Sequence, residues 1–212
     1  LGHAYAPQKE RGVFMSENGG DTWKHVLYID NNTGISDIVM DPDNSRILFA
    51  GAWQLDLKTW RRISGGPGSG LFKSVDGGNT WNKLKGNGLP NKDVGKIALA
   101  MTPASPDRLY ALIETGDGVP YMGKETESGE LWRSDDNGKT FKLINSNRNL
   151  GGRQAYYTRT AASTDNPNEL YFMSNRFYSS IDGGVSLENR PQLSSPNWDH
   201  HEMWIDPFNG DR

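Results

Sequence analysis

The feature that most constrains this chain is an internal repeat of a short Ser/Asp/Gly/Trp segment. Its first copy, Ser-Glu-Asn-Gly-Gly-Asp-Thr-Trp, begins at Ser16, and related copies begin at Ser74, Ser134 and Ser180. A second pattern, an apolar run that ends in Asp-Pro or an equivalent turn, recurs in step with the first. Its copies begin at Ile38, Leu99, Thr160 and Met203. Two patterns that share one period indicate a repeated supersecondary unit.

Each repeat has the composition of four short strands joined by turns. In the second unit the expected strands are residues 35–40, 46–53, 70–74 and 81–84. Asp-Pro, Asn and Gly occupy the connections, where they favour turns. A four-stranded unit of roughly 40–50 residues is the signature of a β-propeller blade. The predicted fold class is therefore all-β, a β-propeller of four-stranded blades.

The phase of the repeat predicts about three whole blades and two partial ones, which is about half of a ring. Propellers close with roughly 4–8 blades, so the remaining blades are expected from the same chain or another one. No signal peptide is visible at the start of the sequence. The predicted division is a partial blade at 1–28, blades at 29–88, 89–147 and 148–197, and the first strand of a further blade at 198–212.

Composition excludes several classes of function. The formal net charge is −3, which argues against a nucleic-acid partner. No apolar run approaches the ~20 residues of a membrane span. The absence of cysteine excludes disulfides, a thiol nucleophile and a cysteine zinc site. The Gly-rich stretch 65–70 lacks the Lys-Ser/Thr ending of a phosphate-binding loop. No cofactor is predicted.

The Ser-x-Asp-x-Gly-x-Thr-Trp segments resemble the Asp-box, or BNR repeat. The resemblance implies a hairpin that joins the third and fourth strands of a blade. In such a hairpin the Ser and Asp side chains bond the turn, glycine permits it, and the aromatic residue packs on a neighbour. These residues are therefore predicted to be structural and not catalytic. They are Ser16, Asn18, Trp23, Ser74, Asp76, Trp81, Ser134, Asp136, Phe141, Ser180 and Asp182.

Three stretches, residues 1–16, 63–74 and 199–207, resemble bacterial exported BNR-repeat proteins of the sortilin/VPS10-like or glycosyl-hydrolase-like type. With the boxes, the resemblance covers nearly the whole chain. It implies export to the periplasm or the extracellular space, and it assigns no reaction. Sialidases pair the box with Arg-Ile-Pro, whereas the nearest segments here are Arg46-Ile-Leu and Arg62-Ile-Ser.

Candidate site residues come from the first strands, which surround the central channel of a propeller. Aligning the turns places Asp37, Arg159 and Glu202 in one row, with Lys96, Tyr157 and His200 two residues earlier in their strands. Residues two apart in a strand point to the same side, so these groups are expected near one channel mouth. The alternative is a set of mutually paired charges that line a water-filled channel. The predicted ligand-binding residues are Lys96, Tyr157, Arg159, Trp198, His200 and His201.

A metal site at the same place is a further alternative. His200 and Glu202 share a predicted strand face, and a third ligand such as Asp37 would have to come from another blade. A histidine that hydrogen-bonds a neighbouring loop is the favoured alternative, so no metal is predicted.

Two functions fit these residues, and the sequence leaves open whether the chain is an enzyme. The first is an exported, non-catalytic binding or scaffold module for a protein, peptide or glycan, with Trp60 and Tyr121 as loop contacts. The second is a glycoside hydrolase, or a lyase, that acts on a polysaccharide. It would use Asp37 and Glu202 as a carboxylate pair separated by the ~5–10 Å that glycosidases require.

Overall fold

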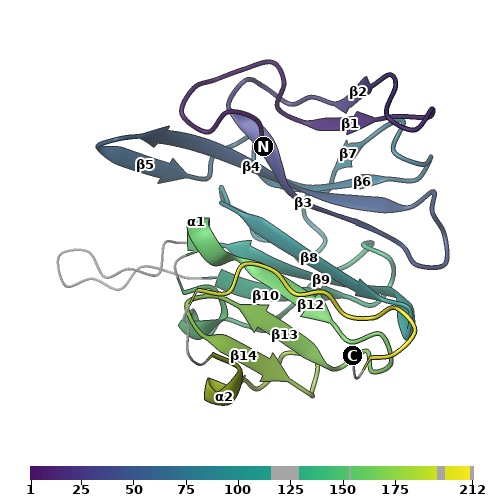
Figure 1. Cartoon of the computed structure of the whole chain (residues 1–212), viewed down its shortest axis with the longest axis vertical. Coiled ribbons are helices and arrows are strands. Elements are labelled where there is room, and N and C mark those ends of the chain that lie inside the picture. The colour runs from purple at the N-terminus through teal and green to yellow at the C-terminus, as the bar shows by residue number, and fades with distance from the viewer. Residues whose placement is uncertain (116–128, 153, 195–198, 211–212) are drawn as a thin grey trace.

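The chain folds into β-sheets that follow one another along the chain, as predicted for an all-β propeller segment (Figure 1). The computed structural model describes residues 1–115, 129–152, 154–194 and 199–210. None of the helices in these ranges has the length and apolar composition that crossing a bilayer requires. The helical segments are the 3-10 turn η1 (Arg148–Leu150), α1 (Gln154–Tyr157) and α2 (Pro191–Ser194).

The first two sheets contain the N-terminal part of the chain. Every neighbouring pair of strands is antiparallel, and the strands of each sheet lie in chain order except for the side hairpin formed by β4 and β5. One sheet is β1 (Val13–Met15) and β2 (Lys24–Leu27); the other is β3 (Thr33–Met40), β4 (Leu48–Lys58), β6 (Gly70–Ser74) and β7 (Asn82–Lys83), with β5 (Arg61–Ser64) on β4.

Two four-stranded sheets complete the described fold. They repeat the same order, so that β3, β8 and β12 are equivalent first strands. The third sheet is β8 (Ile97–Thr102), β9 (Ser105–Glu114), β10 (Gly129–Ser134) and β11 (Lys142–Asn145), and the fourth is β12 (Arg159–Ala162), β13 (Leu170–Met173), β14 (Phe177–Ser180) and β15 (Glu188–Asn189).

The core lies between consecutive sheets, and β8 shows why. Its Ile-Ala-Leu-Ala run alternates large and small apolar side chains. Ile97 and Leu99 pack toward the preceding sheet in one core cluster, whereas Ala98 and Ala100 pack toward the following sheet in another. Because side chains alternate across a strand, a continuous apolar run buries both faces. The first strand of this blade is thus fixed between its two neighbours.

Each Asp-box forms a turn with a shared set of hydrogen bonds. In the third box Ser134 Oγ donates to Asp136 Oδ1 over 2.7 Å and accepts the Gly138 N–H over 2.8 Å. Asp136 also accepts the N–H and the hydroxyl of Thr140, at 2.8 and 2.6 Å. Equivalent serine contacts are made at Ser16 with Asn18, Ser74 with Asp76 and Ser180 with Asp182.

The box carboxylates are held in their ionised form. Hydrogen bonds from Thr80, followed by that from Ser74, lower the pKa of Asp76 to about 2. Bonds from Ser186, followed by that from Ser180, lower the pKa of Asp182 to about 2. A carboxyl group with so low a pKa accepts hydrogen bonds at neutral pH and has no proton to donate. The turn geometry therefore accounts for these aspartates without any chemistry.

Trp23 differs from the aromatic residues of the later boxes. Phe141 is 5% exposed in the core, and the Trp81 indole donates to a main-chain carbonyl, but Trp23 is 63% exposed. The third box packs on the preceding sheet so closely that a Cβ at Gly138 would lie 2.6 Å from Phe49 Cε1. In the described chain no sheet precedes β1 and β2. Trp23 therefore has no sheet to cover it.

The box serine gives a first testable expectation. Ser134 is 1% exposed, so Ser134→Ala would leave the buried Gly138 N–H without its acceptor. We expect a loss of about 1–2 kcal/mol in the free energy of unfolding, measured by urea denaturation. Ser16→Ala, in the more exposed first box, is the matched control and is expected to lose less. Equal losses in both variants would contradict this account.

The second blade carries a hairpin where the sequence predicts a loop. The predicted second strand at 46–53 continues as β4 to Lys58 and turns back as β5, and this hairpin projects beyond the sheet (Figure 1). Asp56 pairs with both Lys58 and Arg61 across it. The alternation of Leu55, Asp56 and Leu57 is a strand pattern. The Gly-rich stretch that follows this alternation favours a loop, so the sequence did not predict the strand.

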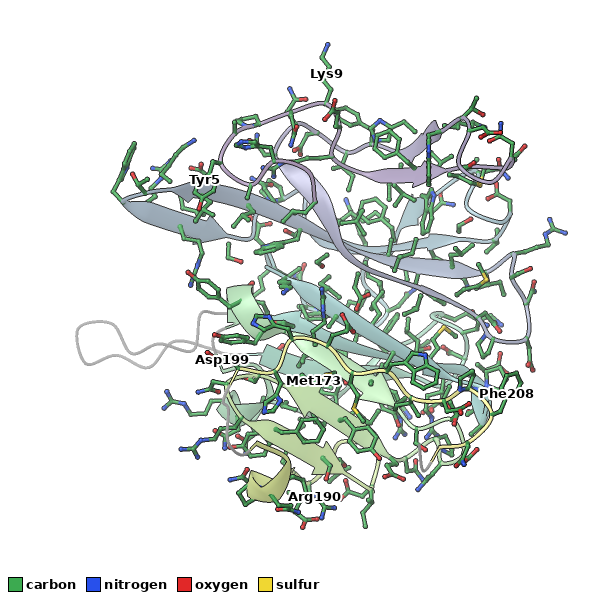
Figure 2. All side chains as sticks on the ribbon, viewed as in Figure 1. Tyr5, Lys9, Met173, Arg190, Asp199 and Phe208 are labelled. Atoms are coloured by element: carbon green, nitrogen blue, oxygen red, sulfur yellow. The ribbon has the colours of Figure 1, made fainter. Side chains whose placement is uncertain are left out.

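The last described segment also differs from the expectation for residues 198–212. Its described residues form no strand, and they make one isolated bridge, between Asp206 and Asn209. A strand exists only where a neighbour supplies a ladder of hydrogen bonds. Figure 2 shows Asp199 and Phe208 at opposite ends of this segment, which runs beside β12. His200 N–H donates to Ser174 O at its start.

Candidate ligand site at the channel mouth

The candidate site is built where the first strands of three sheets come together. We call Asp37 on β3, Lys96 just before β8, Arg159 at the start of β12 and Glu202 on the last segment the mouth cluster. The predicted row is thus gathered from four places in the chain. Their electrostatic coupling is mutual, because Arg159 and Glu202 both influence the pKa of Asp37 and that of Lys96.

A bulge in β3 aims the first member of the cluster. The pairing of β3 with β4 shifts register between Ile35 and Asp37, and Ser36 lies at the shift. Ser36 Oγ donates to Ile97 O at 2.7 Å, which ties β3 to β8. A bulge re-aims the side chains around it. As a result Asp37 reaches β8, where its Oδ2 accepts the Leu99 N–H at 2.9 Å.

Asp37 and Glu202 have unlike surroundings. Asp37 is half-buried, and its Oδ1 accepts the Ile38 N–H at 2.9 Å. Burial raises the pKa of Asp37, opposed by the Leu99 hydrogen bond and by Arg159. Glu202 is exposed, and its Oε2 lies 3.7 Å from Arg159 Nε. Arg159 Nη1 in turn donates to Ser36 O at 3.1 Å. The arginine therefore contacts both β3 and the acid of the last segment.

Lys96 is a buried cation of the mouth cluster. It is 6% exposed, its Nζ donates to Tyr156 O at 3.2 Å, and the same nitrogen lies 5.5 Å from the centroid of the Trp53 ring. Burial, followed by repulsion from Arg159, lowers the pKa of Lys96 to about 8. An ammonium held against an aromatic face is stabilised by the ring quadrupole.

A third acid, Glu114, lies next to this lysine. The Glu114 carboxylate is 3% exposed, and its Oε2 accepts the main-chain N–H of Lys96 at 2.7 Å and the hydroxyl of Ser64 at 2.6 Å. Ser64 Oγ also accepts the Trp53 indole N–H at 2.9 Å. Burial raises the pKa of Glu114. This chain of bonds fixes the β4–β5 hairpin against the next sheet.

Two exposed aromatic side chains, which we call the rim, belong to α1 beside the site and to the tip of the β4–β5 hairpin. Tyr156 on α1 is 55% exposed, and the Arg62 guanidinium lies 5.0 Å from the centroid of its ring. Trp60, at the tip of the β4–β5 hairpin, is 80% exposed. Tyr157 is buried, with its ring centroid 4.9 Å from that of His201. The sequence-predicted Trp198, like the loop residue Tyr121, lies outside the described residues.

His200 is separated from the mouth cluster. Its ring packs edge-on to Phe177 of β14 with centroids 5.5 Å apart, whereas Glu202 faces Arg159 of β12. The two residues of the possible metal pair thus have different neighbours. Among the described residues, no group of three or more His, Asp or Glu is placed to hold a metal ion.

A family model described as Sortilin-Vps10 (Sortilin, neurotensin receptor 3) matches residues 11–176, which include the first three Asp-boxes. That match covers well over half of the chain. The chain belongs to the Sortilin-Vps10 family. The resemblance drawn from the boxes and flanking segments is confirmed.

Two of the proteins that this Sortilin-Vps10 chain resembles are named xyloglucanases. The Xyloglucanase of Hypocrea jecorina (strain QM6a) is 29% identical over 157 residues, a match that covers 68% of the chain and 16% of the xyloglucanase. Among solved structures, the GH74 xyloglucanase from Xanthomonas campestris is 18% identical with a TM-score of 0.57, covering 84% of this chain and 25% of that one. An ancestral GH74 enzyme is 21% identical, with a TM-score of 0.57, and covers 85% and 21%.

The Sortilin-Vps10 chain spans about a sixth of the xyloglucanase from Hypocrea jecorina. The likeness to the solved structures shows the fold alone.

Two residues of the site, Ser64 and Glu114, were not predicted from the sequence, whereas Trp53 and the two tyrosines at 156 and 157 were candidate ligand contacts. One signal was available for Glu114, because it directly follows the continuous apolar run Leu109–Ile113. A charge at the end of a buried strand predicts a partnered acid. The contacts of Ser64 had no such signal, since the hairpin that carries it was not predicted.

Proposed function

We propose that this chain is part of an exported β-propeller that binds a glycan at the mouth cluster and does not cut it. The binding module predicted from the sequence also allowed a protein or peptide ligand. A glycan is favoured by the aromatic rim and by the relative named a xyloglucanase. Export is carried over from the resemblance to exported BNR-repeat proteins, and it is part of the proposal.

The observation that supports the proposal is the set of hydrogen bonds and ion pairs made by the two acids of the mouth cluster. Both carboxylate oxygens of Asp37 accept main-chain N–H groups, and Arg159 lies against Glu202. A glycosidase needs one acid that gives a proton and one that faces the sugar or a water molecule. Here Asp37 instead accepts hydrogen bonds from β3 and β8, and Glu202 pairs with Arg159. Their contacts favour a preformed polar binding surface.

The rim supplies the apolar part of such a surface. Sugar rings present C–H faces that pack on flat aromatic side chains, while their hydroxyls need polar partners. Tyr156 offers one exposed ring next to Arg62, and Trp60 offers another at the end of the same hairpin. Arg159 and Glu202 of the mouth cluster would supply a donor and an acceptor. This combination suits a neutral polysaccharide.

Further blades, from the same chain or another, complete the ring in this proposal. Two groups of exposed apolar side chains support it. Trp23 is 63% exposed on the outermost sheet, and Ile38 and Met40 are 44% and 51% exposed on the first strand β3. Side chains of this kind are covered in a closed propeller, where each sheet packs on the next.

The test measures the binding of a xyloglucan oligosaccharide by isothermal titration calorimetry. Tyr156→Ala is expected to weaken binding about tenfold, because it removes a stacking surface. The Lys96 contact uses the main-chain carbonyl of Tyr156 and is kept in this variant. Phe208→Ala is the control, since Phe208 is 95% exposed at the other end of the last segment (Figure 2). Equal affinity in both variants would show that the mouth is not the binding surface.

A second candidate function, glycoside hydrolysis, has one observation in its favour. Burial raises the pKa of Asp37, and a general acid needs a raised pKa. The same oligosaccharide therefore serves in an assay for new reducing ends. The binding proposal expects none. Release of reducing ends that Asp37→Asn and Glu202→Gln both abolish would establish the hydrolase in its place.

A further inference from the structure

We propose that the outer edge of β5 accepts an added strand from a partner protein, an extended segment in which acidic and β-branched apolar side chains alternate. β5 pairs with β4 on one side, and within the parts of the chain that the structure describes no strand pairs with its other side. Its first three residues are exposed, and the hairpin projects beyond the sheet (Figure 1). The inference does not rest on glycan binding.

The main-chain groups of Arg62 point to this open edge. At the base of the hairpin the Gly65 N–H donates to Gln54 O at 2.9 Å. Hydrogen-bonded and non-bonded residue pairs alternate along an antiparallel ladder, so the next bonded pair is Asp56 with Ile63. Arg62 lies outside these bonded pairs, and its N–H and C=O therefore point away from β4. An extended segment beside β5 would bond both groups.

The base of the hairpin is fixed to the next sheet, so the edge is preformed. Ser64 Oγ donates to Glu114 Oε2 at 2.6 Å and accepts the Trp53 indole N–H at 2.9 Å. Two residues further on, Gly66 forms a bridge with Val94. A binding surface that is already ordered loses little conformational entropy when its partner arrives.

The side chains of β5 define which segment fits. Because side chains alternate across a strand, Arg62 lies on one face of β5 and Ile63 on the other. Arg62 is exposed with its guanidinium 5.0 Å from the centroid of the Tyr156 ring, and an acidic side chain opposite it would meet this cation. Ile63 is 49% exposed and offers an apolar contact. Successive residues of the added strand therefore meet opposite chemistry.

Charge favours an acidic partner over a second copy of this chain. The hairpin carries Lys58, Arg61 and Arg62 against one acid of its own, Asp56, which pairs with Lys58 and Arg61. Arg62 also interacts electrostatically with Glu114, but that carboxylate is 3% exposed and cannot reach the outer edge. Two β5 edges paired with each other would place arginines opposite arginines, which is destabilising.

The test uses the peptide acetyl-Val-Glu-Val-Glu-Val-amide, with binding to the labelled whole chain followed by heteronuclear NMR. We expect the main-chain amide signals of β5 to shift on titration. The peptide with lysine in place of both glutamates should bind at least about tenfold more weakly. N-methylation of both glutamates should abolish binding, because these N–H groups would bond β5. N-methylation of the central valine is the matched control and should not weaken binding, since that N–H points away from β5.

Two variants at one position separate the side chain from the main chain. Arg62→Gln keeps the N–H and is expected to weaken peptide binding about fivefold. Arg62→Pro also removes the outward N–H without breaking a bond to β4, and it should abolish binding. Arg46→Gln removes an exposed arginine outside the hairpin and is the charge control.

Far-ultraviolet circular dichroism checks that each variant keeps its sheet content, and the comparison of peptides needs no variant. Equal binding of the two N-methylated peptides would overturn the proposal, because the main chain of β5 would then play no part. Equal binding of the glutamate and lysine peptides would overturn it as well, because the arginines would then select nothing.

Discussion

Replacement of Arg11 by methionine is expected to reduce the free energy of unfolding by about 3 kcal/mol or more. Arg11 is 1% exposed, and its guanidinium donates to main-chain carbonyls. Its Nη1 bonds Asn32 O and Leu55 O, and its Nη2 bonds His3 O and Ala6 O. Methionine fills a similar volume but leaves these acceptors unpaired. The N-terminal segment would then lose its attachment to β4.

Two further variants make this expectation specific. Arg46→Met removes an exposed arginine of the same chain and is expected to change stability little. Arg11→Lys keeps the charge but has fewer donors in a less suitable geometry, so its loss should be intermediate. Urea denaturation followed by tryptophan fluorescence measures all three. If Arg11→Met unfolds at the same urea concentration as Arg46→Met, the guanidinium does not hold the segment.

The Asp-box turns and the sheet order could be predicted from the sequence because their causes are local. A serine, an acid, a glycine and a threonine between Ser134 and Thr140 make the hydrogen bonds of the turn in the third box. Repetition at one period then determines how the units are stacked. The row of Asp37, Arg159 and Glu202 followed from the same alignment, since equivalent strand positions lie close together in a propeller.

Arg11 and the β3 bulge could not be predicted, because their causes are distant in sequence. Arg11 lies between Glu10 and Gly12 in no recognisable motif. The sequence around it therefore does not predict hydrogen bonds to Asn32 and Leu55. The register shift at Ser36 depends on contacts with β8, some sixty residues later. Alternation places side chains on one face or the other, but it cannot show where a bulge re-aims them.

The second large effect is expected from Lys96 of the mouth cluster, which should make the free energy of unfolding depend on pH. Its pKa in the folded chain is about 8, against an ordinary value of 10.5. Between these two values the unfolded chain binds more protons than the folded one, so stability rises with pH. At about 1.4 kcal/mol for each pKa unit, Lys96 adds about 3 kcal/mol between pH 8 and 10.5.

Substitution of the charged neighbours of Lys96 should change its pKa and therefore the size of this pH dependence. Arg159 lowers the pKa of Lys96, whereas Glu114, Asp37 and Glu202 raise it. Arg159→Gln should therefore move the pKa of Lys96 back toward 10.5 and reduce the alkaline gain in stability. Lys96→Met should eliminate that gain, because methionine does not titrate.

The measurement is the free energy of unfolding from urea titrations at several values between pH 7 and 10.5, taken as the difference between wild type and Lys96→Met. Other groups that titrate in this range contribute equally to both proteins and cancel. A difference that grows in favour of the wild type with pH supports the buried cation. Parallel curves would mean that Lys96 keeps its ordinary pKa, so that the mouth holds its lysine in water and not against Trp53.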